Sequence, residues 1–208
     1  MKRFIAAAAA ALALCLDERA GPDGPWAEAV AAWAGAGRIR KLARRARTSH
    51  WRAVQEIEGT TVAREGAEVR ALVPGDVEEV AHEVSRLQIG GTDLPADDPG
   101  PPPPGRPTIW LSPEVEQTTG KAAAQVGHAS MILATVLDAE GADPGAALEA
   151  SVRIASRAAW AAWTAALTDD PSGRGAWESH GIVAVRDAGF TEVAPDTMTC
   201  IAERAGGS

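Results

Sequence analysis

Apolar residues in the second half of the chain fall into short runs that alternate with longer stretches of helical spacing. Short runs rich in β-branched residues are typical of strands, and apolar residues three or four positions apart are typical of helices. Strands are predicted over residues 108–111, 150–155, 182–185 and 198–202, and helices over 120–138 and 156–168, with a loop over 169–180. This β-α-β-α-β-β order predicts the α/β class, with a small mixed β-sheet of about four strands sandwiched by helices.

The first half carries less regular patterns and predicts a smaller helical and β-hairpin region. Helices are predicted over 4–16, 26–35 and the basic stretch 38–52, and a short helix and a strand over 75–94. In the basic stretch, the apolar residues with helical spacing are Ile39, Leu42, Ala43 and Ala46. Residues 60–63 and 67–73 flank Glu65-Gly66, a pair typical of tight turns, and therefore predict a β-hairpin.

Prolines divide the chain. Residues 96–106 contain Pro99 and the run 101–104, a composition that favours an extended spacer. We interpret this segment as a linker rather than as a ligand for proline-binding modules. The sequence thus predicts an N-terminal region over 1–95, a linker over 96–106 and a second domain over 107–208.

The first sixteen residues allow two interpretations. Met1-Lys2-Arg3 and the apolar run that ends at Leu16 resemble a signal peptide, and the run is too short to span a bilayer. Asp17 and Glu18 follow it and provide no small-residue cleavage site, while alanine and leucine are the best helix formers. We expect a buried or amphipathic helix in a cytoplasmic protein with no membrane partner. The alternative is an exported protein.

Cysteine and histidine are sparse. The two cysteines, Cys15 and Cys200, show no Cys-x-x-Cys spacing, and the four histidines are scattered. This pattern predicts neither a disulfide framework nor a zinc site, and it favours a reducing compartment. We therefore expect no metal and no cofactor.

Charge is distributed unevenly along the 208 residues. The net charge of −8 argues against a general nucleic-acid binder, but no acid occurs between Glu28 and Glu56. We predict that the basic residues of this stretch contact the phosphates of a nucleic acid, the alternative being a solvated or acid-paired face. The residues concerned are Arg38, Arg40, Lys41, Arg44, Arg45 and Arg47.

Polar side chains that could take part in catalysis occur at two places in the sequence. Lys121, Gln125 and His128 are spaced four and three residues apart, so they share one face of the predicted helix 120–138. Asp187 follows the predicted strand 182–185, and Gly189 permits a sharp turn after it. Because ligands bind at the carboxyl ends of strands in open α/β sheets, we expect Asp187 to meet the helix there. Each of these residues, taken singly, also has a plain packing or turn-forming interpretation.

The two places carry motifs that resemble a known family. One is Gly120-Lys121-Ala122-Ala123-Ala124-Gln125-Val126-Gly127-His128-Ala129-Ser130, and the other is Asp187-Ala188-Gly189-Phe190-Thr191-Glu192-Val193-Ala194-Pro195-Asp196-Thr197-Met198-Thr199. In this order they resemble the type 2 peptidyl-tRNA hydrolases, whose signature is GK-x-AAQ-x-x-HA followed by DAG-x-T-x-x-x-PGT-x-T. The resemblance covers residues 108–202.

The resemblance implies a metal-independent enzyme that hydrolyses the ester bond of peptidyl-tRNA, releases the peptide and recycles the tRNA. It also implies a homodimer. Asp187 would orient water or act as a base, Lys121 would neutralise an oxyanion or a phosphate, and His128 would orient the set. Carried over by position, the active-site residues are Lys121, Gln125, His128, Asp187, Thr191 and Thr199.

Two residues depart from the family signature. Asp196 stands where the family has glycine, and Glu192 stands where glutamine is common. A positive φ at Asp196 would carry a cost, and both residues add negative charge beside a site for RNA. The alternative function is therefore a catalytically weak member of the same fold that acts as an RNA-binding or protein-interaction module.

Overall fold

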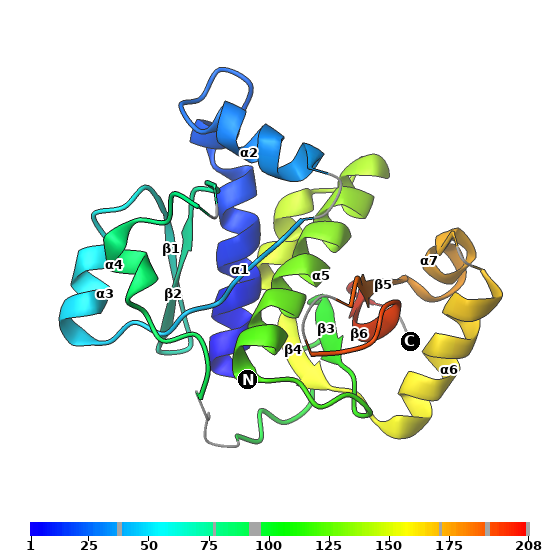
Figure 1. Cartoon of the computed structure of the whole chain (residues 1–208). Coiled ribbons are helices and arrows are strands. Elements are labelled where there is room, and N and C mark those ends of the chain that lie inside the picture. The colour runs from blue at the N-terminus through cyan, green and yellow to red at the C-terminus, as the bar shows by residue number, and fades with distance from the viewer. Residues whose placement is uncertain (37–38, 77, 92–96, 171, 190–191, 207–208) are drawn as a thin grey trace.

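A four-stranded mixed sheet organises the second half of the chain (Figure 1). The computed structural model describes residues 1–36, 39–76, 78–91, 97–170, 172–189 and 192–206. The strands are β3 (Thr108–Leu111), β4 (Ser151–Ile154), β5 (Ile182–Asp187) and β6 (Thr197–Glu203), in the spatial order β4-β3-β6-β5. β3 and β4 are parallel, and β6 is antiparallel to β3 and β5. The predicted α/β class and the small mixed sheet are confirmed.

Alternating side chains give the sheet two apolar faces. Cys200 and Ala202 of β6 pack on one side, where α5 (Thr119–Ala139) lies, and Ile201 packs on the other against Trp160 of α6 (Arg157–Asp169). The side chain of Thr118 caps α5, and that of Ser156 caps α6, each by accepting a hydrogen bond from a backbone N–H of the first turn. The ends of both helices lie within one residue of the predicted ranges.

Helix α1 (Lys2–Leu16) lies between α5 and the β-hairpin of the first half (Figure 1). Ile5, Ala8 and Leu12 belong to the same buried cluster as Val126 and Leu133 of α5. Residues 2–16 are thus a core helix that joins the two halves of the chain into one packed unit. Among the described residues, no helix is both long enough and apolar enough to cross a membrane.

The hairpin of the first half forms as predicted. β1 (Gly59–Arg64) pairs with β2 (Ala67–Leu72) in an antiparallel register that places Arg64 opposite Ala67. The turn residues Glu65 and Gly66 both have positive φ, at 49° and 78°, as the tightest hairpin turns require. The remaining helices of this half are α2 (Ala27–Gly35), α3 (Thr48–Val54) and α4 (His82–Ser85), and 3₁₀ turns occur at Glu18–Ala20 and Pro144–Glu149.

Three predictions about local structure are wrong. The basic stretch does not form one helix, because its described residues 39–47 are extended, with Arg45 bridged to Gln88, and only Thr48–Val54 is helical. The predicted loop 169–180 contains α7 (Arg174–His180), which is bounded by left-handed Gly173 and Gly181. Within the described part of 75–94, α4 is present, but the predicted strand is reduced to the isolated bridge at Gln88.

Candidate active site

Lys121 and Asp187 form an ion pair where the first turn of α5 meets the end of β5. Lys121 Nζ lies 2.5 Å from Asp187 Oδ2, and the two side chains are 10% and 9% exposed. The Thr118 cap places Lys121 in the first helical turn, and the β5–β6 ladder places Asp187 opposite Thr197. The pair is thus held by two rigid elements and is largely shielded from water. Because the interior has a lower dielectric constant than water, the attraction between the two charges is strong there.

Gln125 and Thr199 extend the pair into a buried chain of hydrogen bonds. The amide nitrogen of Gln125 donates to Asp187 Oδ2 at 2.7 Å, and the Thr199 hydroxyl donates to Gln125 Oε1 at 2.8 Å. Gln125 is 3% exposed, and Thr199 is fully buried. Because a carboxylate only accepts, the amide orientation is determined: its NH₂ faces Asp187 and its oxygen faces Thr199.

The surroundings keep Asp187 ionised. Burial by itself raises the pKa of the Asp187 carboxyl, but the Lys121 ammonium, the Gly189 N–H and the Gln125 amide together outweigh it, so the pKa lies below its ordinary value. Gly189 N donates to Oδ1 at 2.8 Å, which leaves Lys121 and Gln125 on Oδ2. An ionised, fixed carboxylate of this kind accepts hydrogen bonds well and is a weak base.

The segment after β5 is folded back onto the site. Gly189 has a φ of 78°, and a Cβ there would lie 2.5 Å from the backbone nitrogen of Pro195, so only glycine fits this turn. Asp196 has a φ of 66°, so it adopts the left-handed conformation that carries a cost for a residue other than glycine. Its carboxylate lies 3.2 Å from Arg186 Nη1, so its negative charge is paired on the outer side of β5.

Glu192 has a role that the sequence analysis did not assign. Its carboxylate accepts hydrogen bonds from the backbone N–H of Thr118 at 2.9 Å and from the Thr118 hydroxyl at 2.7 Å. A carboxylate at a helix N-terminus is favoured by the helix dipole. Glu192 therefore fastens the segment after β5 to the start of α5. The sequence analysis noted Glu192 only as a departure from the family signature, and no local pattern predicts its contact with Thr118.

His128 lies on the same stripe of α5 but has a different partner. Its Nδ1 is 2.9 Å from Lys41 Nζ, and no hydrogen bond joins it to Lys121, Gln125 or Asp187 among the described residues. Burial and then the charge of Lys41 lower the pKa of His128 to about 3, so the imidazole is neutral at physiological pH. His128 therefore lies at the edge of the cluster, and no contact to the other candidate residues supports the predicted orienting role.

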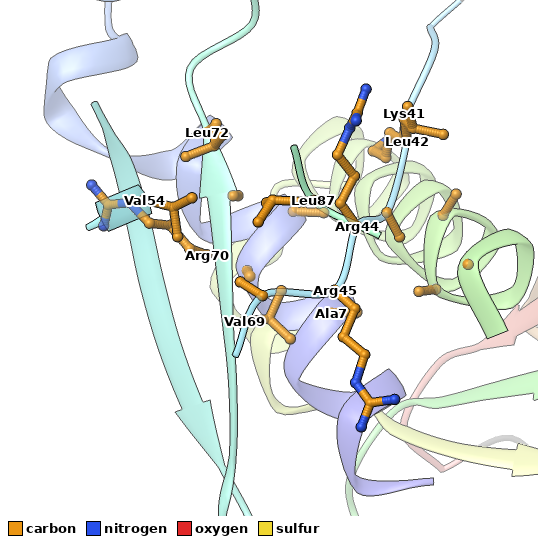
Figure 2. Close-up of a pocket in the computed structure, with 18 of the residues that line it drawn as sticks. Ala7, Lys41, Leu42, Arg44, Arg45, Val54, Val69, Arg70, Leu72 and Leu87 are labelled. Atoms are coloured by element: carbon orange, nitrogen blue, oxygen red, sulfur yellow. The ribbon is translucent and has the colours of Figure 1, made fainter. Parts of the chain in front are cut away.

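The basic stretch lies beside this stripe. Residues 39–47 cross in front of α1 and α5 (Figure 1), and they border a hollow of about 760 Å³ between α5, α1 and β2. Figure 2 shows Arg44 and Arg45 projecting from the segment in opposite directions. Burial and the charges of Arg47 and Arg3 lower the pKa of Arg45, which reflects the local excess of positive charge. Glu68 is the one acid among the described lining residues.

Two predicted site residues, Thr191 and Arg38, lie outside the described residues. Of the remaining catalytic candidates, the structure brings Lys121, Gln125, Asp187 and Thr199 together, and His128 lies next to them. The described residues contain no cluster of three or more His, Cys, Asp or Glu side chains suited to a metal ion. Cys200 lies under the site, where burial raises the pKa of its thiol to about 12, so it remains a neutral packing residue.

Comparison with known proteins finds no family model and no curated protein that matches this chain, so the function of the site is inferred from its geometry and from the two motifs that form it.

Proposed function

We propose that this chain hydrolyses the ester bond of peptidyl-tRNA, releasing the peptide and a reusable tRNA. The observation that carries the proposal is the chain Lys121–Asp187–Gln125–Thr199, because it assembles the matching positions of both motifs from α5, β5 and β6. Ester hydrolysis needs an oriented water molecule and a cation or donor for the oxyanion. Asp187 and Lys121 provide these two functions side by side.

In the proposed reaction, the water oxygen attacks the carbonyl carbon of the ester, and Asp187 orients that water by accepting a hydrogen bond. The carbonyl oxygen gains negative charge, which Lys121 stabilises as a nearby cation. Collapse of the tetrahedral intermediate breaks the bond to the ribose oxygen, and a proton from the attacking water passes to that oxygen. Gln125 and Thr199 hold the carboxylate in place throughout.

The extended basic segment supports RNA as the part of the substrate that is recognised. Its backbone passes the first turn of α5, where a Cβ added at Gly120 would lie 3.7 Å from the Ala43 carbonyl oxygen. RNA phosphates bound by Arg44, Arg45 and Arg47 would therefore run alongside the stripe that carries Lys121 and Gln125. This contact also accounts for how an acidic protein recognises an anionic substrate.

One observation favours the alternative of a binding module. Both oxygens of Asp187 are already hydrogen-bonded within the protein, as expected of a carboxylate that fastens β5 to α5. In that case the basic segment would still bind RNA, and no turnover would accompany binding. The homodimer and the cytoplasmic location that the sequence suggests remain predictions for both functions.

Peptide release from N-blocked aminoacyl-tRNA, measured with a chelator present, tests the proposal. We expect turnover by the wild type, with Asp187→Asn and Lys121→Met each reducing kcat on the order of 100-fold. Thr135→Ala, on the exposed side of α5, is the matched control and retains full activity. A wild type that binds tRNA with a steep salt dependence but releases no peptide supports the binding module instead. Turnover that survives both site substitutions contradicts the assigned site.

A further inference from the structure

Lys41 reaches His128 from a segment 87 residues earlier in the chain, with 2.9 Å between its Nζ and the Nδ1 of the ring. Its aliphatic stem lies against α5 at Gly127. A Cβ at Gly127 would lie 3.4 Å from Lys41 Cδ and 3.0 Å from the Cβ of Ala11, so the missing side chain makes room for both the lysine and α1. The contact is therefore built into the packing of three segments.

The protonation states determine which group donates. Burial lowers the pKa of Lys41 to about 8 and, with the charge of Lys41, lowers that of His128 to about 3. At pH 7 the lysine is mainly the ammonium form and the imidazole is neutral. An ammonium only donates, so Nδ1 must accept, and the ring proton must reside on Nε2.

The other ring nitrogen, Nε2, is not used by the contact with Lys41. Nε2 has no hydrogen-bond partner among the described residues, and it is not among their fully buried unpaired polar atoms. His128 lies three residues after Gln125 on α5, and the Gln125 amide contacts Asp187, so the ring is near the ion pair, whose two charges both act on it. An N–H donor is thus left open next to the cluster that we assign to ester hydrolysis.

We propose that Lys41 is a positioning residue that holds His128 in its Nε2–H tautomer, and that this N–H donates a hydrogen bond to the ester carbonyl oxygen as it gains negative charge. The proposal rests on the proposed function. It makes His128 a second stabiliser of the oxyanion beside Lys121, and it excludes His128 as a general base. Lys41 therefore acts on the reaction through His128 rather than as one more contact to phosphate.

The surroundings of Lys41 give this role a pH signature. The groups that face it are Cys15 of α1, whose thiol pKa is raised by burial, the ring of Trp33 of α2 at 5.1 Å, and His128 of α5. No carboxylate forms an ion pair with Lys41 within the described part of the chain. As the pH rises through about 8, the ammonium loses its proton, and the neutral amine can then accept from Nδ1–H. The tautomer is no longer fixed, so kcat falls on the alkaline side.

Two measurements test the assignment. Nitrogen-15 NMR of histidine-labelled protein, with the signals identified by His128→Gln, reports the tautomer without any turnover. We expect the Nε2–H form in the wild type and in Lys41→Arg, and a mixture of tautomers in Lys41→Met. An Nδ1–H ring in the wild type, or an unchanged ring in Lys41→Met, overturns the proposal whatever the hydrolysis assay gives. If the ring is in the Nε2–H form but no turnover is found, Lys41 does position His128, and the proposed hydrolase function is overturned.

Hydrolysis kinetics provide the second measurement, with Arg45→Met as the matched loss of one positive charge from the same segment. We expect Lys41→Met to lower kcat severalfold, because only part of the His128 population then carries the Nε2–H, and to abolish the alkaline limb near pH 8, whereas Lys41→Arg restores kcat and moves the limb to higher pH. Arg45→Met should raise KM in a salt-dependent way and leave the pH profile of kcat unchanged. Equal effects of Lys41→Met and Arg45→Met on KM alone would overturn the positioning role.

Discussion

The hydroxyl of Ser130 lies 2.8 Å from the carbonyl oxygen of Ala8 and donates a hydrogen bond to it, which joins α5 to α1 across 122 residues of sequence. Both residues are buried, at 0% and 1% exposure. The contact requires close approach of the two helices, and the alanines of α1 permit it. Helix α1 is thereby fixed against the helix that carries Lys121 and Gln125.

Ser130→Ala should lower the free energy of unfolding by about 1 kcal/mol, since one buried hydrogen bond is lost and Ala8 keeps its partner within α1. Urea denaturation measures the change. Thr135→Ala removes a similar hydroxyl bond to the preceding helical turn at an exposed position, so its effect should stay within about 0.5 kcal/mol. Equal losses of unfolding free energy in the two variants would show that the hydrogen bond between α1 and α5 does not stabilise the fold.

Lys121 and Asp187 should be strongly coupled in stability. Removing one partner leaves the other charge buried, so Lys121→Met and Asp187→Asn should each cost about 3 kcal/mol, and the double variant clearly less than their sum. A double-mutant cycle in urea measures the coupling. Additive losses would contradict the buried pair.

The same pair should make stability fall in acid. The pKa of Asp187 is lower in the folded protein than in the unfolded chain, so its contribution is fully present above about pH 4 and is lost as the pH falls through the folded value. Wild-type protein should therefore lose more stability between neutral pH and acid than Asp187→Asn. Parallel pH profiles of the two proteins would contradict the lowered pKa.

We expect the hydroxyl of Thr199 to contribute to both stability and kcat. Thr199→Val keeps the shape but leaves Gln125 Oε1 buried without a donor, which should cost about 1–3 kcal/mol and reduce kcat because the Gln125 amide is no longer held on Asp187. Thr199→Ser retains the hydroxyl and should keep kcat near the wild-type value. Thermal unfolding and peptide release check the two effects. A serine variant as slow as the valine variant would mean that the packing of the methyl group, not the hydrogen bond, is what the site needs.

Asp196 offers a test of the departure from the family signature. Its φ of 66° suits glycine, so Asp196→Gly should be more stable than Asp196→Ala by about 1–2 kcal/mol, with the wild type between them. Because its carboxylate pairs with Arg186, we expect no change in kcat in Asp196→Gly. A faster glycine variant would show instead that the Asp196 charge acts on the site.

The regular elements around the site could be predicted because local and tertiary signals agree there. Thr118 is a strong N-cap, and the buried face of α5 has helical spacing, so the predicted start and end lie within one residue of Thr119–Ala139. The alternation in β6 likewise matches its two covered faces. The meeting of Lys121 with Asp187 followed from the helix face and the strand end together.

The remaining features depend on contacts that no local pattern encodes. Ile39, Leu42, Ala43 and Ala46 have helical spacing, yet the segment is extended because Arg45 pairs with Gln88 and Lys41 packs at Gly127, and Leu42 is left 62% exposed. Helix α7 is short and flanked by glycines. It is held by Trp177, whose indole N–H donates to Glu140 and whose ring lies beneath Arg204.

The central position of α1 sets an order of events during synthesis. Helix α1 leaves the ribosome before α5, the helix that packs against it, because 122 residues separate Ser130 from Ala8. Contacts between such distant segments form late and slow folding. Until then, the face of α1 that packs against α5 lacks its cover. The completion of α5 is therefore the step that buries this face of α1.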